Sequence, residues 1–485
     1  MINKKVLFRI LLLGCFSLIS LGFYLGLSHY QYRIGFPLDD AWIHQTYARN
    51  IASGKWAFMP GIISGGSTSP LWTYILSIAF SLKIHPQLWT FGINFLILWA
   101  IALIAEYFTR TSISSYNSLF PWIGSLFIFE WHFVWSAGSG METLLFSSCI
   151  LVFFVFLMKE KLQFWILGIV IGIGVWLRPE GVTLLGPALL IWWIRQESIG
   201  KKISELLKLV LPFGILIVFY MVFFDQLTGY PLPTTFYAKQ VEYQSLTTYP
   251  FLKRFGHLGL QLLVGPGIIL LPGLFRYFYK TTMREKLRIL SAILWILGMI
   301  SIYAWKLPVT YQHGRYMIPC MVILILFSVT GMMKYLETNR SKFSIINTSW
   351  TISLIIVLMY FWVSGAISYG KDVSFIEHQM VDTALWIKKN LPPEKIIATH
   401  DIGAIGFFGD HQLVDLAGLV TPEIIPILGK EDQLSSYLDD ANVSYLVSFP
   451  NWFPKLTTGL LSIYSRPVDI TGYYETMNVY SWRNQ

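Results

Sequence analysis

Long apolar stretches separated by short polar loops fill roughly the first 370 residues of the chain. The first stretch runs from about Val6 to Leu27, directly after Lys4 and Lys5. The others lie near 88–108, 118–136, 143–158, 162–177, 181–194, 209–224, 257–275, 288–305, 317–333 and 350–369. Because a membrane-spanning helix needs roughly 20 apolar residues, this pattern predicts a polytopic α-helical membrane protein. One further segment, Pro70–Leu82, is short for a span.

The first apolar stretch has a competing interpretation as a cleaved secretory signal peptide. It is long for a signal peptide, however, and no small-residue cleavage site follows it. We therefore interpret it as a retained first helix, in which Arg9 extends its side chain back to the cytoplasmic surface.

Basic residues concentrate in alternate loops and so orient the chain in the membrane. The richer loops lie near 109–117, 159–161, 195–208, 276–288 and 334–348, and Arg340 and Lys342 belong to the last of them. The positive-inside rule places these loops in the cytoplasm. With the N-terminus also inside and residues 28–69 outside, parity requires that Pro70–Leu82 does not cross. We therefore expect about 11 crossings, with that segment at the outer surface, and about 13 is the alternative.

The tail from about residue 371 has a different pattern and ends up outside in this topology. Helical spacing covers Asp382–Leu391 and Asp432–Asp440, and Gly403–Gly409 is typical of a glycine-rich turn. The predicted strands are Lys395–Thr399, Gln412–Leu416, Ser444–Ser448 and Val479–Trp482. We therefore expect a transmembrane domain over 1–370 with a large first outer loop (28–69), and a small extracytoplasmic α/β domain over 371–485.

Composition excludes an ordinary soluble enzyme. Of the 485 residues, 54% are hydrophobic and only 13% are charged, whereas soluble domains carry roughly 25% charged residues. The net charge of +9 follows from the cytoplasmic loops, so it does not indicate a nucleic-acid partner. The three cysteines, Cys15, Cys149 and Cys320, all lie in apolar stretches, which excludes a disulfide framework or a zinc motif.

The first outer loop contains an adjacent acidic pair, Asp39 and Asp40, before an amphipathic stretch with His44 and Arg49. Two neighbouring carboxylates in a low-dielectric cleft cannot both ionise freely, so the pKa of one of them is raised towards the working pH. A general base requires such a pKa. The alternative is a helix N-cap, in which an Asp accepts backbone N–H bonds. The pair is therefore a candidate base or a cap.

Further polar groups lie on the same side of the membrane in this topology. They are Glu130 and His132 near the outer end of their predicted helix, Glu142, Arg178 and Glu180, Lys239, and His313 and Arg315. Ionisable groups at membrane depth are costly and therefore mark functional sites. The alternatives are a structural ion pair for Arg178 with Glu180, and interfacial snorkelling for Lys239 and Arg315.

This combination of groups suits one chemistry. A lipid-linked phosphosugar would place its phosphate against Arg or Lys and its polyprenyl tail between helices. A carboxylate would then deprotonate an acceptor hydroxyl that attacks the anomeric carbon from the opposite face. No P-loop, zincin helix or G-x-S-x-G elbow favours another reaction.

The segment from Asp39 to Trp72 resembles the first external loop of GT-C glycosyltransferases, which use polyprenyl-phosphate sugars. It is most similar to the branch that contains mycobacterial terminal arabinofuranosyltransferases. The resemblance spans about residues 37–316, with a similar outer tail around Ile402–Pro422. Its motifs are Asp39-Asp40, Tyr47-Ala48-Arg49-Asn50, Met59-Pro60-Gly61, Gly66–Trp72, Gly140–Thr143, Arg178–Gly181, Pro233–Lys239 and His313–Tyr316.

The resemblance implies a GT-C fold and inverting transfer of a sugar from a polyprenyl-phosphate donor to a cell-envelope glycan, lipid or protein. We expect Asp39 or Asp40 to be the catalytic base, in an active site on the extracytoplasmic side of a bacterial inner membrane. The residues expected to bind substrate are His44, Arg49, Glu142, Arg178, Glu180, Lys239, His313 and Arg315. The sequence assigns no metal ligand and no cofactor, and leaves a divalent cation open.

The competing class is a non-enzymatic lipid-glycan flippase or a membrane transporter. Transporters place ionisable groups near the bilayer midplane and often contain inverted repeats. Here the acidic residues lie towards one face and no repeat is evident, which favours the enzyme.

Overall fold

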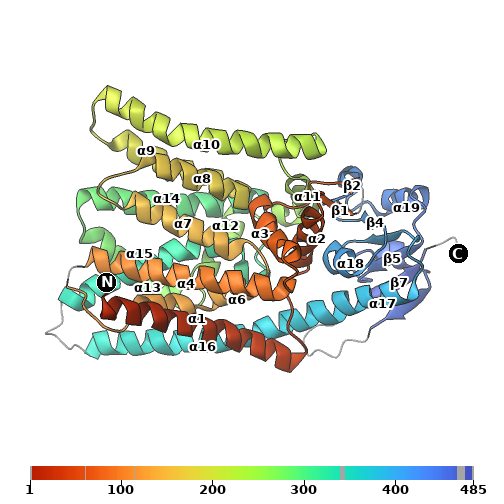
Figure 1. Ribbon diagram of the computed structural model, residues 1–485, viewed down its shortest axis with the longest axis horizontal. Coiled ribbons are helices and arrows are strands. Elements are labelled where there is room, and N and C mark those ends of the chain that lie inside the picture. The colour runs from red at the N-terminus through yellow and green to blue at the C-terminus, as the bar shows by residue number, and fades with distance from the viewer. Residues whose placement is uncertain (1–2, 60–61, 114, 339–344, 467–475, 483–485) are drawn as a thin grey trace.

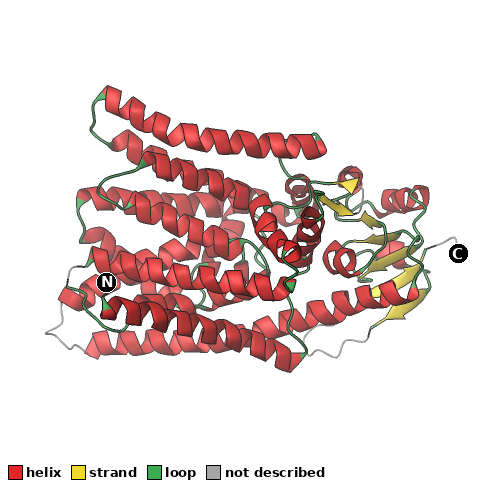
Figure 2. Ribbon diagram, viewed as in Figure 1, coloured by secondary structure: helices red, strands yellow, loops and turns green. Residues whose placement is uncertain are grey.

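A helical bundle with a small α/β domain at one end makes up the computed structural model, which describes residues 3–59, 62–113, 115–338, 345–466 and 476–482 (Figures 1 and 2). Pro60 and Gly61 of one loop motif, and the basic residues Arg340 and Lys342, lie outside the described residues. The N-terminus and the α/β domain are at opposite ends of the bundle (Figure 1), as an odd number of crossings requires.

In the described part of the chain, six helical segments are long and apolar enough to cross a membrane. They are α1 (Lys4–Gln31), α4 (Pro86–Ser112), α10 (Ile199–Thr228), α14 (Met283–Lys306), most of α15 (Ile318–Thr338), and Asn347–Asn390, which begins in α16 (Ile345–Phe375). Shorter apolar helices are α3 (Pro70–Ser81), α7 (Thr143–Leu157), α8 (Phe164–Leu177), η1 with α9 (Pro179–Leu184 and Leu185–Ile194), and α13 (Gly267–Tyr279). The expected multi-pass helical membrane protein is confirmed, while the number of crossings stays a prediction.

Small residues let the long helices pack closely. A Cβ on Gly168 or Gly172, which are four residues apart on α8, would collide with Leu209 or Leu216 of α10. Gly273 of α13 similarly packs against the backbone of α15. Since lipid is as apolar as the side chains, close backbone approach of this kind supplies much of the packing energy between membrane helices.

Two predicted spans are interrupted. The stretch 118–136 forms α5 (Trp122–Phe129) and α6 (Trp131–Gly138), separated at Glu130. The Glu130 carboxylate accepts a hydrogen bond from the Phe133 N–H (3.2 Å) and lies 2.7 Å from His132 Nδ1. The two residues therefore lie in the middle of this segment and not near its outer end, which corrects the expectation. The stretch 257–275 likewise divides into α12 (Phe251–Gln261) and α13.

The first outer loop folds as α2 (Asp40–Ala52) and a short hairpin of β1 (Ala57–Met59) and β2 (Ile62–Ile63). Helix α3 packs against α2 and lies with it at the end of the bundle that faces the α/β domain (Figure 1). This position agrees with the prediction that Pro70–Leu82 does not cross the membrane.

Helix α16 does not end at the predicted boundary near residue 370. It continues through a π-helical turn (Ile376–Val381) into α17 (Asp382–Asn390), so one continuous helix connects the bundle to the α/β domain. The 1–370 and 371–485 division stays a prediction, and it falls inside this helix.

The α/β domain contains a five-stranded sheet in the order β4-β3-β5-β7-β6. Strands β3, β4 and β5 are parallel, and β7 is antiparallel to β5 and β6. The bounds are β3 (Ile397–Thr399), β4 (Leu413–Asp415), β5 (Tyr445–Ser448), β6 (Ser462–Ser465), β7 (Asn478–Ser481), α18 (Ile402–Phe408), η5 (Pro422–Ile427), α19 (Glu431–Asp440) and α20 (Pro454–Thr457). The predicted turn Gly403–Gly409 is wrong, since most of it is α18, and β6 was not predicted.

Three short helices precede α12 or α15 in the chain: α11 (Thr234–Glu242), η2 (Gln244–Thr248) and η3 (Gln312–Gly314). Two of them, α11 and η3, carry the predicted site residues Lys239 and His313. Thr234 and Thr235 at the start of α11 donate hydrogen bonds to the carbonyl oxygens of Leu419 and Gly66. Helix α11 is thereby fixed between the first outer loop and the α/β domain.

Candidate active site

Two cavities meet at the junction of the bundle and the α/β domain. The domain-side cavity, about 1000 Å³, lies between the bundle and the α/β domain. The helix-side cavity, about 520 Å³, lies among η1, α11 and α14 and is lined mainly by apolar side chains. Five residues line both cavities: Asp40, Ile43, Lys239, Arg315 and Leu419. A ligand in either cavity therefore reaches the same three charged groups.

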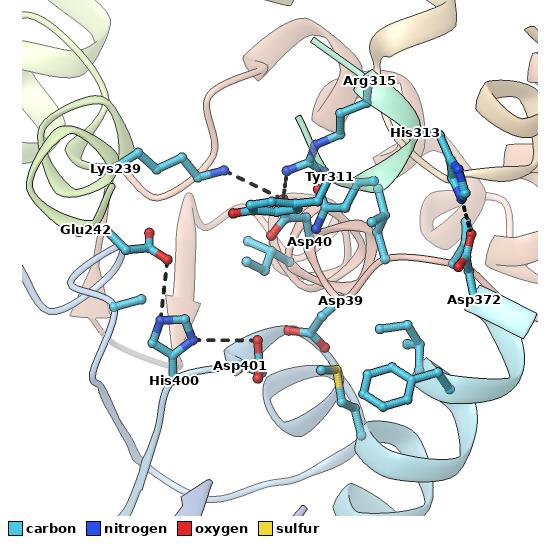
Figure 3. A pocket seen from close by; sticks show the side chains of 18 of the residues that line it. Asp39, Asp40, Lys239, Glu242, Tyr311, His313, Arg315, Asp372, His400 and Asp401 are labelled. Carbon is cyan, nitrogen blue, oxygen red and sulfur yellow. Dashed lines mark hydrogen bonds and ion pairs between the residues drawn. The ribbon is translucent and has the colours of Figure 1, made fainter. Parts of the chain in front are cut away.

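Asp40 begins α2 and lies between two cations that come from distant parts of the chain (Figure 3). Arg315 Nη2 donates to Asp40 Oδ2 at 2.7 Å, and Lys239 Nζ lies 3.7 Å from the same oxygen. Burial raises the pKa of Asp40, but Lys239 and then Arg315 outweigh it and hold the pKa well below its usual range. Asp40 is therefore an ionised carboxylate at neutral pH.

The Arg315 guanidinium retains unused hydrogen-bonding capacity. Its side chain is only 6% exposed, and Nη1 is buried without a hydrogen-bond partner among the described residues. A buried guanidinium N–H is costly to leave unpaired. Because Arg315 lines both cavities, its guanidinium lies beside the space that a ligand in either cavity would occupy.

Asp39 points away from the cations, on the side of Asp401 (Figure 3). It makes no side-chain cap to its own helix, and instead accepts hydrogen bonds from the N–H groups of Gly403 (2.6 Å) and Ala404 (2.8 Å) at the start of α18. Burial, and then the Asp401 charge, raise its pKa to about 8 against the effect of these two donors. Asp39 thus caps a helix, but one in the other domain.

We expect Asp39→Asn to weaken the docking of the α/β domain, because an amide offers only one acceptor oxygen to two N–H donors. The folded-state pKa lies above the unfolded value of about 3.9, so the folded protein binds more protons between these values. The stability contributed by Asp39 should therefore fall as pH rises from about 4 to 8, and stay constant above that range. Melting temperature measured against pH in detergent should show this slope in the wild type and lose it in Asp39→Asn. An equal slope in both proteins would contradict the assignment.

A second charged cluster lines the helix-side cavity around Glu142. His44 Nε2 lies 3.5 Å and Arg178 Nη1 3.4 Å from its carboxylate. Burial raises the pKa of Glu142, but His44 and Arg178 outweigh it and lower the pKa to about 2. Arg178 also pairs with Glu180 (3.3 Å), and both contact the Tyr303 hydroxyl. The expected Arg178–Glu180 ion pair is present, but it belongs to a wider network that faces a cavity.

Four acidic or histidine residues of the domain-side cavity, Glu242, Asp372, His400 and Asp401, were not anticipated from the sequence. Asp372, near the end of α16, accepts a hydrogen bond from Trp135 Nε1 (3.0 Å) and lies 2.7 Å from His313 Nε2. The other three form a chain in which His400 lies 3.5 Å from Glu242 and 3.7 Å from Asp401. His400 and Asp401 directly follow β3, and polar residues at the carboxyl end of a parallel strand are a usable signal of a site.

Burial lowers the pKa of His400, but the Asp401 and Glu242 carboxylates outweigh it and raise the pKa to about 10. His400 is therefore a cation at neutral pH. Since Glu242 is one turn after Lys239 on α11, this ion pair helps to hold Lys239 in its position.

Arg49 is the one predicted site residue that the structure does not bring to the cavities. Its guanidinium donates to the carbonyl oxygens of Phe407 (2.7 Å) and Gly406 (3.3 Å) at the end of α18. A cation at a helix C-terminus satisfies free carbonyls and complements the helix dipole. This geometry assigns Arg49 a structural contact, and substrate binding by it stays an untested prediction.

The acidic pair does not fit a divalent cation. The Asp39 oxygens accept backbone N–H bonds, whereas Asp40 faces two cations. In the described part of the chain no three His, Cys, Asp or Glu side chains gather as a metal-binding group. We therefore derive no step through a metal ion.

Comparisons with known proteins bear on the fold. Residues 364–481 match a protein-family model described as a domain of unknown function, DUF8728. No curated protein matches the chain. The cryo-EM structure of the arabinofuranosyltransferase AftD from mycobacteria matches 96% of this chain and 39% of AftD, with 12% identity and a TM-score of 0.47.

Two crystal structures of ArnT from Cupriavidus metallidurans match more completely. The structure bound to undecaprenyl phosphate has a TM-score of 0.56 and 11% identity, and the apo structure 0.57 and 12%. Each match covers 96% of this chain and 97% of ArnT. At such identities the likeness concerns the fold. It confirms the fold expected from the loop motifs, because this chain has the membrane fold of ArnT.

Proposed function

We propose that the chain is a membrane glycosyltransferase that transfers a sugar from a polyprenyl-phosphate donor to an envelope acceptor with inversion of configuration. One observation carries the proposal. An ionised carboxylate, Asp40, lies where two cavities meet and is held by Arg315 and Lys239. A base, a phosphate-binding guanidinium with a free N–H group and room for two substrates are thus in one place.

The donor occupies the helix-side cavity. Its polyprenyl chain packs on apolar side chains such as Val182, Ile302 and Leu307, and its phosphate reaches Arg315 and Lys239. ArnT, whose fold this chain shares, binds undecaprenyl phosphate, which supports a lipid of this class. A guanidinium binds phosphate oxygens in a fixed bidentate geometry.

The acceptor enters through the domain-side cavity and presents a hydroxyl to Asp40. Asp40 takes the hydroxyl proton as the oxygen attacks the anomeric carbon, and the polyprenyl phosphate leaves with the electron pair of the broken bond. Attack from the face opposite the phosphate inverts the configuration. A bound phosphate also competes for Arg315 and Lys239, which weakens their hold on Asp40 and makes it a stronger base than in the free protein.

The network of His44, Glu142, Arg178 and Glu180 lines the helix-side cavity and binds the hydroxyl groups of the donor sugar. Glu142 lies between His44 and Arg178, so its oxygens are fixed in orientation. Fixed acceptors of this kind orient a substrate at little entropic cost.

A comparison of envelope glycans tests this function. Mass spectrometry of a deletion strain should show the loss of one sugar from one envelope component, and the wild-type gene should restore it. A flippase or transporter predicts a different result, in which the purified protein forms no glycosidic bond from a polyprenyl-phosphate sugar. If a folded preparation of the protein gives that result, the proposed transferase function is refuted.

The orientation of the site is a separate prediction. A reporter that is active only outside the cytoplasm should be active when fused after Gln485 and inactive when fused after Lys202, because basic residues near Lys202 mark a cytoplasmic loop. The reverse pattern would place both cavities on the cytoplasmic side.

A further inference from the structure

The turn before Arg315 has an unusual backbone. Gln312, His313 and Gly314 have φ values of 56°, 56° and 62°. Left-handed conformations are common for glycine but unfavourable for residues with a Cβ, and they normally occur singly. Gly314 also needs to be glycine for space, since a Cβ there would lie 2.9 Å from Gln261. A turn of this kind persists only where its surroundings hold it in place.

One side chain of the turn is held by groups from two helices. His313 Nε2 lies 2.7 Å from Asp372 Oδ2, and Trp135 Nε1 donates to the same oxygen at 3.0 Å. The His313 ring also packs edge-to-face against Trp131 and Trp135, with distances between ring centroids of 5.3 and 5.2 Å. Figure 3 shows this contact on the opposite side of Arg315 from Lys239.

Arg315 directly follows this turn and carries the group that the proposed function requires. Its guanidinium donates to Asp40 through Nη2 and leaves Nη1 buried and unpaired. Relaxation of the turn to the right-handed region would rotate the backbone before Arg315 and move its guanidinium away from Asp40. The position of Arg315 therefore depends on what holds His313.

We propose that Asp372 is a positioning residue, which holds the left-handed turn through His313 and thereby sets the Arg315 guanidinium for phosphate binding. The inference rests on the proposed function, because it assumes that Arg315 binds the donor phosphate. Asp372 lies in the segment 364–481 that matches the domain of unknown function. Asp372 thus supports the donor site from this segment without itself lining the helix-side cavity.

The rival explanation is that Asp372 only joins α16 to the neighbouring helix. Asp382, which lies further along the same continuous helix, provides a matched control. Its carboxylate pairs with Arg33 and Arg466, each at 2.9 Å, and it lines neither cavity. Loss of either carboxylate should destabilise the junction, but only Asp372 should affect ligand binding.

The test measures the Kd for undecaprenyl phosphate in detergent by native mass spectrometry, with melting temperatures in parallel. We expect Asp372→Ala to raise Kd about tenfold and Asp382→Ala to leave it unchanged. In an Arg315→Ala background, Asp372→Ala should add nothing, because the two residues act through one group. If Asp372→Ala does not fold, Asp372→Asn replaces it in the same double-mutant comparison with Arg315→Ala, because it removes the charge and keeps the size of the side chain.

The outcomes are distinguishable. If Arg315→Ala weakens binding but Asp372→Ala does not, or if the effect of Asp372→Ala persists without Arg315, the positioning role is refuted and the proposed function stands. If the wild type does not bind undecaprenyl phosphate, or Arg315→Ala binds it normally, the proposed donor site fails and the positioning role fails with it.

Discussion

Asp40→Asn should abolish sugar transfer while the protein still folds and binds the donor lipid. The amide keeps the size of the side chain but cannot accept a proton, and loss of a general base typically lowers the rate about 10²–10⁴-fold. Undecaprenyl phosphate should bind at least as well as to the wild type, because the variant no longer competes with phosphate for Arg315 and Lys239. The measurements are envelope mass spectrometry of the complemented deletion strain and the Kd of the purified variant.

The neighbouring variant Asp39→Asn is the control. Asp39 accepts hydrogen bonds from the backbone of α18 and does not face the cations. The Asp39→Asn variant should therefore be less stable, and the protein that folds should retain transfer. If Asp39→Asn abolishes transfer in folded protein and Asp40→Asn does not, the two roles are exchanged. If both variants transfer normally, the base lies elsewhere, and Glu142 and Glu180 are the next candidates.

The membrane architecture is predicted well from the sequence, because membrane spans depend on local properties of each segment. Apolar length and loop charge are readable segment by segment, and most predicted spans coincide with helices. The interruptions were not readable in this way. Glu130 breaks a span because its carboxylate caps α6 and contacts His132, and a criterion of apolar length does not detect a cap inside an apolar stretch.

The same distinction applies to the site. Adjacency of Asp39 and Asp40 marked the loop, but not which carboxylate faces the cavities. That depends on Arg315 and on the N-terminus of α18, which lie about 275 and 364 residues away in the sequence. The start of α18 itself is stabilised by Asp39, so local spacing predicted a turn where the domains together make a helix.

Asp372 was missed for a related reason. It is a single acidic residue near the outer end of a span, without a motif around it, and such residues are ordinarily interfacial. Its significance comes from His313, which the resemblance did identify. A predicted site residue with a left-handed backbone is therefore a useful starting point for finding the residues that support it.

Arg315 can be explained either as an interfacial anchor or as a phosphate-binding residue, and the two explanations predict different results for its variants. An interfacial anchor needs a charge in contact with the membrane surface, and any cation would serve. The structure instead has a buried guanidinium with one nitrogen on Asp40 and the other unpaired. A planar guanidinium donates several N–H bonds in a fixed geometry that matches phosphate oxygens, whereas the lysine ammonium acts as a point charge.

We therefore expect Arg315→Lys to raise the Kd for undecaprenyl phosphate about tenfold and Arg315→Ala about a hundredfold, as charge-assisted hydrogen bonds contribute roughly 1.5–3 kcal/mol. The amount of folded protein should change little in the lysine variant. Lys253→Ala, which removes an exposed cation near the start of α12 that lines neither cavity, should leave Kd unchanged. A lysine variant that binds as tightly as the wild type would contradict the phosphate contact and direct attention to Lys239 and Arg178, two other cations of the helix-side cavity.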